Sequence, residues 1–219
     1  MTQNKFITAP RMAARTALIL FLFVLVFTSL LSGAYVWTRS SIEAAAAEEK
    51  MKLIDEVLPR DRYDNKLLDD AAVLDAAPEL GFGPGEPARI LRARKAGRVE
   101  ALVLEAVAPD GYSGRIRLLL ALRDDGEVIG VRVIAHKETP GLGDYIEPQK
   151  DRNKARPWIT QFDGLNPATI DAHEWKVRKD GGRFDSVAGA TVTPRAVIKA
   201  VRKAALFVVA NSERILASE

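Results

Sequence analysis

The stretch that decides the fold runs from Arg98 to Glu138 and reads "RVEALVLEAVAPDGYSGRIRLLLALRDDGEVIGVRVIAHKE". Runs of Val, Ile and Leu of strand length are separated by the turn sequences "PDG" and "DDGE". Apolar runs bounded by Gly and Asp turns are typical of hairpins. "RILRARKAG", directly before this stretch, has the same character. The sequence therefore predicts a mainly antiparallel sheet and, with the helices described below, an α+β fold.

The composition limits the chemistry that the chain can carry. Its 219 residues allow one or two domains. Cysteine is absent, which excludes disulfides, thiolate zinc sites, cysteine-ligated iron–sulfur clusters and c-type haem attachment. With only His136 and His173, far apart in sequence, we expect no metal site. Redox chemistry in this chain therefore requires an organic cofactor.

The charge pattern argues against nucleic-acid binding. The chain has 32 basic and 29 acidic residues, which give a net charge of +3. The two kinds are intermixed, without the Lys/Arg runs that nucleic-acid-binding segments carry.

The N-terminal region predicts a membrane anchor. Residues 16–37 contain no charged side chain, and a helix of that length is about 33 Å long at about 1.5 Å per residue, enough for the hydrocarbon core. We expect one transmembrane helix over residues 16–38 in a cell inner membrane. A cleavable signal peptide is the alternative, because "LLSGA" offers small residues near the end of the segment.

The charges that flank this segment predict its direction. Lys5, Arg11 and Arg15 precede it without any acid, whereas Glu43 and Glu48 follow it closely. Basic residues accumulate on the cytoplasmic side of a span. Residues 1–15 are therefore expected in the cytoplasm and the long C-terminal part in the periplasm.

The rest of the chain divides by composition. Residues 39–87 predict a stalk and connecting segment, with an Ala/Glu-rich helix from Ser41 to Leu58 and short helical turns in "DNKLLDDAAVL". Residues 88–219 predict a folded domain. Within it, "HEWKVRKDGGRFDSVAGA" suggests another strand or hairpin, and a last helix is expected from Pro194 to about Leu216.

The turn before this last helix has the features of a phosphate site. Residues 188–190 are small, Thr191 follows, Thr193 is a good N-cap, and Pro194 suits the first helical position. The unpaired N–H groups and the dipole of a helix start favour an anion. The ordinary alternative is a Thr-Pro cap without a ligand.

Three basic residues follow on one face of the same helix. Arg195, Lys199 and Arg202 stand at i, i+4 and i+7. They would strengthen binding of an anion, although such a stripe is also typical of a solvated helix face. Spacing alone does not identify the ligand.

Two motifs resemble a known family. "DSVAGAT", Asp185 to Thr191, resembles the flavinylation motif Asp-x-x-(Ser/Thr)-Gly-Ala-(Thr/Ser), with Ala188 where the motif carries Ser or Thr. "GYSGRIRLLLALRDDGEVIGVRVIAHKETPGLGD" resembles the body of the FMN-binding domain, including its "ETPGLG" loop. The order of membrane anchor, this block, a "W…QF" segment and the terminal motif resembles the G subunit of the Rnf (Rsx) electron-transport complex. The C subunit of the sodium-pumping NADH:quinone oxidoreductase is a close relative.

The resemblance implies a cofactor, partners and a role. A flavin transferase would join one FMN, through its phosphate, to the hydroxyl of Thr191. The chain would then relay electrons in a complex that couples electron transfer between ferredoxin and NAD to ion translocation. The partners implied are the other integral-membrane and redox subunits, because one span and no nicotinamide fingerprint do not make a complete enzyme. Residues 88–219 would be the FMN-binding domain.

The residues expected at the cofactor fall into two groups. Those near the phosphate are Thr191, Gly189, Ala190, Thr193 and Lys199, together with Asp185, whose side chain is expected to fix the turn by accepting a backbone N–H. Those near the isoalloxazine are Glu138, Thr139, Gly141 and Leu142.

Other residues near the motifs receive no such role. We expect no catalytic acid or base, His136 included, because electron transfer needs proximity and a tuned potential. Trp158, Phe162 and Trp175 lie either near the ring or in the core.

Three alternatives stay open at this point. The first is the corresponding subunit of a sodium-translocating NADH:quinone oxidoreductase, or a stand-alone flavinylated periplasmic reductase. The second is a non-flavinylated assembly or scaffold subunit. Its support is Ala188, which stands where the flavinylation motif carries Ser or Thr. The third is a secreted, cleaved binding protein.

Overall fold

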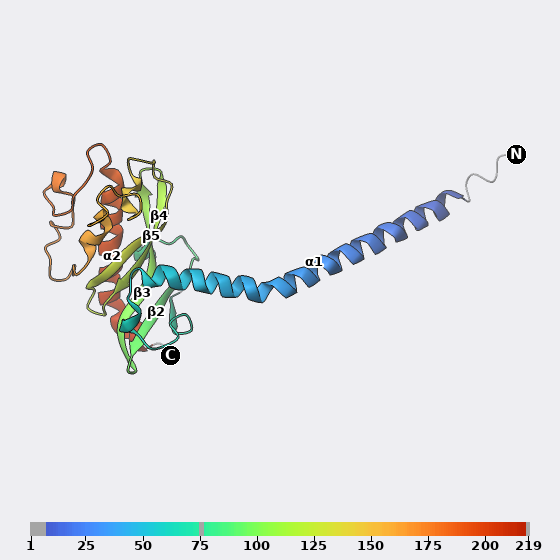
Figure 1. Ribbon diagram of the computed structural model, residues 1–219, viewed down its shortest axis with the longest axis horizontal. Coiled ribbons are helices and arrows are strands. Elements are labelled where there is room, and N and C mark those ends of the chain that lie inside the picture. Colours follow the sequence, from blue (N-terminus) through green and yellow to red (C-terminus); the bar gives the residue numbers. More distant parts are fainter. Residues whose placement is uncertain (1–7, 75–76, 218–219) are drawn as a thin grey trace. The chain divides into compact units, whose positions relative to one another are not determined.

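The computed structural model describes residues 8–74 and 77–217, which fall into two compact units, Met1–Glu49 and Lys50–Glu219 (Figure 1). Helix α1 (Thr8–Asp55) makes up the described part of the first unit, and its last turns begin the second.

In the first unit, α1 contains the whole segment expected to cross a membrane. Its large apolar side chains between Leu18 and Trp37 are exposed. The hydroxyls of Thr16 and Thr38 donate to backbone carbonyls one turn earlier, at 3.0 and 2.8 Å, so these polar groups are satisfied within the helix. Within the described ranges, α1 is the helix that is long and apolar enough to span a bilayer.

The second unit is built on a five-stranded sheet in which each strand pairs antiparallel with the next along the chain. The predicted antiparallel meander is confirmed. The strands are β1 (Ala71–Leu74), β2 (Ala88–Lys95), β3 (Arg98–Gly111), β4 (Gly114–Leu122) and β5 (Val128–Ala135).

Both faces of this sheet are covered. On β3, Leu102 and Leu104 face the cluster that includes helix α2 (Val192–Ala217), whereas Val103 between them faces residues 51–68. Helix α2, coloured red in Figure 1, lies along one face. Because both faces are packed over most of their length, the strands read as nearly continuous apolar runs instead of alternating ones. Residues 39–87 were expected to form a stalk and connection; from Lys50 onward they belong to the compact second unit.

Short 3-10 turns position the loops between β5 and α2. An aromatic cluster packs around one of them, and its members Trp158, Phe162, Trp175 and Phe184 are all buried. Trp158, Phe162 and Trp175 were expected either near the flavin ring or in the core, and the structure places them in the core. The turns of the whole unit are η1 (Arg60–Arg62), η2 (Pro78–Leu80), η3 (Asp144–Ile146), η4 (Trp158–Phe162) and η5 (Arg178–Asp180).

Two expectations about local structure were wrong. "AAVL", expected to be helical, forms β1, because Ala72 and Leu74 are buried on the inner face of a strand that pairs with β2. The segment expected to form a strand or hairpin folds instead around η5, with a single bridge between Val177 and Phe184. The turn there is tight: a Cβ on Gly182 would lie 2.1 Å from the carbonyl oxygen of Lys176.

The C-terminal end of α1 and the N-terminal end of α2 differ slightly from the prediction. α1 ends at Asp55, three residues before the predicted Leu58. α2 begins at Val192, so Thr193 lies inside its first turn instead of capping it. The hydroxyl of Thr193 is hydrogen-bonded to Glu138, and a tertiary partner of this kind overrides a local capping preference.

The close approach of β5 to the segment after α1 yields a test. A Cβ on Gly130 would lie 2.6 Å from the carbonyl oxygen of Val57, which is rigid backbone. We expect Gly130→Ala to lower the free energy of unfolding by about 1–3 kcal/mol through overpacking. The measurement is thermal or urea unfolding of the full-length protein in detergent. Gly83→Ala is the matched control, since the nearest atom lies 3.6 Å from its Cβ. Equal stability of the two variants would contradict the packing described here.

Candidate functional site

The two motifs singled out in the sequence meet at one cavity of about 110 Å³. One wall comes from the loop after β5, the other from the turn that starts α2, and the β3–β4 hairpin closes a third side. The lining residues are Tyr112, Glu138, Thr139, Leu142, Gly143, Gly189, Ala190, Val192 and Thr193.

A buried carboxylate ties these three elements together. Glu138 is 4% exposed, and its Oε1 accepts a hydrogen bond from the backbone N–H of Ser113 at 2.9 Å. Its Oε2 accepts one from the hydroxyl of Thr193. A buried carboxylate is tolerated only when such partners replace water. Its neighbour Gly143 has no room for a side chain, because a Cβ there would meet Glu138 Oε2 and Thr193 Oγ1 at 2.7 and 2.8 Å.

The loop that carries Glu138 closes on itself. The carbonyl of Thr139 accepts from the N–H groups of Leu142 and Gly143, both at 3.1 Å. Gly141 has a φ of +77°, a left-handed conformation that favours glycine, and its N–H donates to Asp144 Oδ1 at 2.8 Å. The "ETPGLG" sequence thus makes a compact turn with Leu142 exposed at the cavity.

Thr191 is the residue directly before α2 and is half-buried. Arg195 Nη1 donates to its Oγ1 at 3.1 Å. The same guanidinium donates through Nε and Nη2 to the two carboxylate oxygens of Asp180, at 2.6 and 2.7 Å. The hydrogen bond from Arg195 holds the pKa of Asp180 below its usual range. No local signal in the sequence pointed to Asp180, because it belongs to a loop whose path is set by tertiary contacts.

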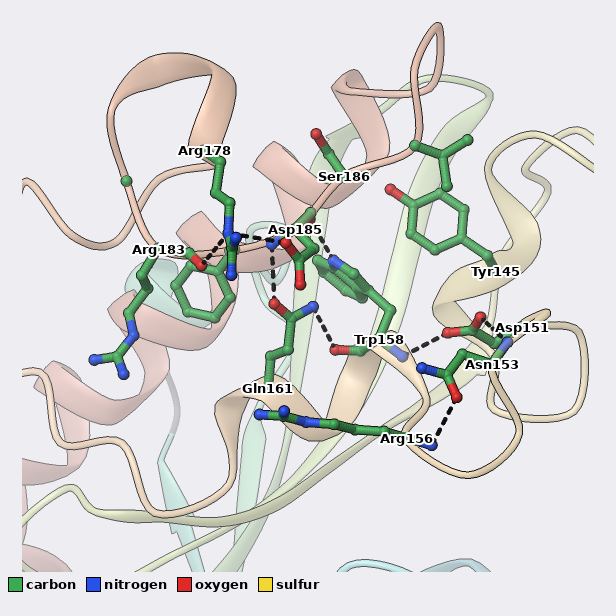
Figure 2. A pocket seen from close by; sticks show the side chains of 13 residues that line it. Tyr145, Asp151, Asn153, Arg156, Trp158, Gln161, Arg178, Arg183, Asp185 and Ser186 are labelled. Atoms are coloured by element: carbon green, nitrogen blue, oxygen red, sulfur yellow. Dashed lines mark hydrogen bonds and ion pairs between the residues drawn. The ribbon is translucent and has the colours of Figure 1, made fainter.

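The main chain of the flavinylation-like motif is held at Asp185. Its N–H donates to Gln161 Oε1 at 2.9 Å, and its carbonyl accepts from Trp158 Nε1 at 2.6 Å. Its carboxylate, expected to accept a backbone N–H of the turn, pairs with Arg178 Nε at 2.9 Å. Figure 2 shows these contacts in a second, larger cleft of about 640 Å³ on this side of the motif.

Tyr145 holds the other end of the motif. Its phenol donates to the carbonyl of Ala190 at 3.3 Å, and its ring packs edge-on against Trp158. Burial raises the pKa of Tyr145 to about 12. This residue was not predicted from the sequence, although its position directly after the "PGLGD" turn was a usable signal.

Four of the predicted residues, Gly141, Asp185, Thr191 and Lys199, are not among those that line the cavity. The Nζ of Lys199 pairs with Asp110 at the end of β3, at 2.7 Å. The described residues also hold no group of three or more His, Asp and Glu side chains placed for a metal ion. The arrangement is a shallow apolar cavity beside a hydroxyl and a guanidinium, which suits binding of a cofactor with an anionic end.

Comparison with known proteins agrees with this geometry. Residues 111–206 match the FMN-binding domain, and residues 1–57 match the RnfG N-terminal region. The chain is 46% identical over 209 residues to the G subunit of the ion-translocating oxidoreductase complex of Pseudomonas aeruginosa (strain UCBPP-PA14); the match covers 95% of this chain and 94% of that protein.

Two further relatives carry the same name. The protein of Pseudoalteromonas atlantica is 42% identical, over 94% of this chain and 92% of its own length. That of Vibrio atlanticus is 37% identical over 93% of both. The cavity and its two motifs lie within the matched FMN-binding domain, so the chain belongs to the family of ion-translocating oxidoreductase complex G subunits, the Rnf-type proteins.

Proposed function

We propose that this protein carries one FMN, joined through its phosphate to Thr191, and relays electrons within an Rnf-type complex. The observation that carries the proposal is the convergence of two motifs some 50 residues apart, residues 138–143 and 189–193, on one cavity next to Thr191. FMN supplies the redox chemistry when bound, and the protein positions it and sets its surroundings.

The cavity fits a flavin that is only partly covered. Its volume of about 110 Å³ is well below the roughly 300–1,000 Å³ of sites that enclose a whole ligand of drug size. Three of its lining side chains are large, apolar and exposed: Tyr112 at 70%, Leu142 at 50% and Val192 at 43%. An isoalloxazine ring resting on them would bury this apolar surface. One edge would stay open to a redox partner.

The surroundings of the two threonines favour Thr191 over Thr193 as the proposed attachment site. Thr193 is 2% exposed and its hydroxyl is engaged with Glu138. Thr191 is more accessible and faces Arg195, which would pair with the negative charge of a phosphodiester. The N–H groups at the start of α2 would add to this attraction. Thr191 is therefore the proposed attachment residue.

Ala188 bears on the scaffold alternative. The residue is exposed, so the alanine leaves no buried group unsatisfied and does not disturb the cavity. The features that would hold the cofactor are intact around it. This favours a flavin-carrying subunit over a scaffold that has lost its site.

The proposed setting follows from α1 and the relatives' names. α1 would anchor the protein in the inner membrane with residues 1–15 in the cytoplasm and the FMN-binding domain in the periplasm. The relatives are named subunits of an ion-translocating complex. We therefore place this chain with other membrane and redox subunits, between ferredoxin and NAD as the terminal electron carriers, and with a flavin transferase for maturation. The names favour this complex over the sodium-translocating NADH:quinone oxidoreductase.

The attachment is tested by mass spectrometry of the denatured protein purified from membranes. We expect a mass increase of FMN less one water on the peptide that contains Thr191, with fragment ions that exclude Thr193. Thr191→Ala should remove the adduct completely. Thr191→Ser, which keeps a hydroxyl, should retain it. An adduct on the alanine variant, or an unmodified wild-type chain from cells that flavinylate a control protein, would overturn the proposal.

The orientation of the protein in the membrane is tested by cysteine labelling. The chain contains no cysteine, so the introduced one alone can react. We expect a membrane-impermeant maleimide to label Asp125→Cys, on the exposed turn before β5, in cells whose outer membrane is permeabilised. Met12→Cys should react only after the inner membrane is broken. Labelling in the reverse order would refute the periplasmic location.

A further inference from the structure

We propose that Asp180 is a positioning residue for flavin attachment: it fixes the guanidinium of Arg195 so that Nη1 faces the hydroxyl of Thr191. This inference rests on the proposed attachment of FMN to Thr191. It goes further by assigning a role to two residues outside the flavinylation-like motif.

The geometry begins with the guanidinium fork. Arg195 uses Nε and Nη2 for the two oxygens of Asp180, at 2.6 and 2.7 Å, which is the bidentate arrangement that fixes a guanidinium plane. One nitrogen then remains outside the ion pair. That nitrogen, Nη1, is the one that donates to Thr191 Oγ1 at 3.1 Å.

Asp180 is itself held by the backbone. It is the last residue of η5, and its N–H donates to the carbonyl of Val177 at 2.8 Å. The next residue, Gly181, has a φ of +84° and donates to the carbonyl of Arg178 at 3.0 Å. The carboxylate is therefore presented from an ordered turn.

The ion pair between Arg195 and Asp180 orients the guanidinium more than it stabilises the fold. The side chains of Arg195 and Asp180 are 41% and 34% exposed. Ion pairs this open add little to folding stability, because water screens them. A free arginine on a helix surface samples many rotamers, and the pair removes that freedom at the hydroxyl that is to be modified.

The chemistry of attachment explains why this orientation matters. Thr191 Oγ forms a bond to the FMN phosphorus as the phosphoric anhydride bond of an activated donor, such as FAD, breaks. The hydroxyl proton passes to a base of the transferase, and the departing phosphate, AMP in the case of FAD, takes the bonding electrons. Because Nη1 donates to Oγ, the hydroxyl hydrogen stays free to point away toward that base. The guanidinium also lies beside the position where the phosphodiester charge will reside.

The same helix offers a matched control. Lys199, one turn after Arg195, pairs with Asp110 at 2.7 Å, and these side chains are 55% and 47% exposed. This pair is alike in type and position, but its ion pair does not involve Thr191. Its loss should leave attachment unchanged, although Lys199 was expected near the phosphate from its place in the sequence.

The experiment measures attachment directly. Full-length variants are purified in detergent from cells without flavin transferase and incubated with purified transferase and FAD, and adduct formation is followed by intact mass. We expect Asp180→Asn to lower kcat about three- to tenfold and Arg195→Ala about tenfold to a hundredfold, with KM for the acceptor protein little changed. Asp110→Asn, which breaks the neighbouring pair from its acidic side, should stay within about twofold of the wild type, which is the scatter expected for surface changes.

Two further readouts separate positioning from a structural effect. Added methylguanidinium should restore attachment to Arg195→Ala, whereas methylammonium should not. Arg195→Lys, which keeps the charge without the fork, should be as slow as Asp180→Asn. If Asp180→Asn proves less stable in thermal unfolding, this lysine variant decides the question.

Failure of this role and failure of the proposed function give different results. A wild-type chain that accepts no flavin would overturn the proposed function itself. A wild-type chain that is flavinylated normally, with Asp180→Asn and Arg195→Lys as fast as the Asp110 variant, would overturn only the role of Asp180.

Discussion

The carboxylate of Glu138 is the interaction on which the site depends. It is buried among a hairpin, a loop and a helix start, and its two oxygens accept from Ser113 and Thr193. Each hydrogen bond connects the loop that carries Glu138 to one other element. The two bonds together therefore hold three elements around the cavity. A buried carboxylate also leaves little freedom to its surroundings, because losing either partner would leave charge unsatisfied in the interior. This explains why a glycine, Gly143, stands against it, where any side chain would collide.

The sheet and the aromatic cluster extend this constraint to the motif. Asp185 and Ala190 are held through their main-chain atoms by Trp158, Gln161 and Tyr145. The backbone of the motif is thus fixed from the core side, while Thr191 remains accessible on the other. Such an arrangement separates the residues that shape the turn from the residue that would carry the cofactor.

Much of this architecture could be predicted from the sequence. The strands β2 to β5 follow from apolar runs and turn residues, and α2 from its apolar face, because both signals are local. β1 could not be predicted, since three of its four residues favour a helix and become a strand only by pairing with β2. The motif residues and the "ETPGLG" loop were found because they resemble the flavinylation motif and the FMN-binding domain, whereas the spacing of small residues alone did not identify a ligand. Asp180 and Tyr145 were not found, since their roles come from side-chain contacts across distant parts of the chain. Thr193 was misread as a cap for the same reason: its partner, Glu138, lies 55 residues away.

The site is assembled from segments that lie far apart in the sequence, so it forms only when the domain has folded. The cavity exists only after residues near 112, 138 and 193 have come together, and the guanidinium of Arg195 is held beside Thr191 only after Asp180 has reached it. A chain that has not yet folded offers the motif as a bare peptide without these neighbours. A transferase that depends on them would act as a checkpoint on folding: it would load cofactor onto finished domains and pass over chains that are still extended. Flavin content would then report on the folding of the protein as well as on the supply of cofactor.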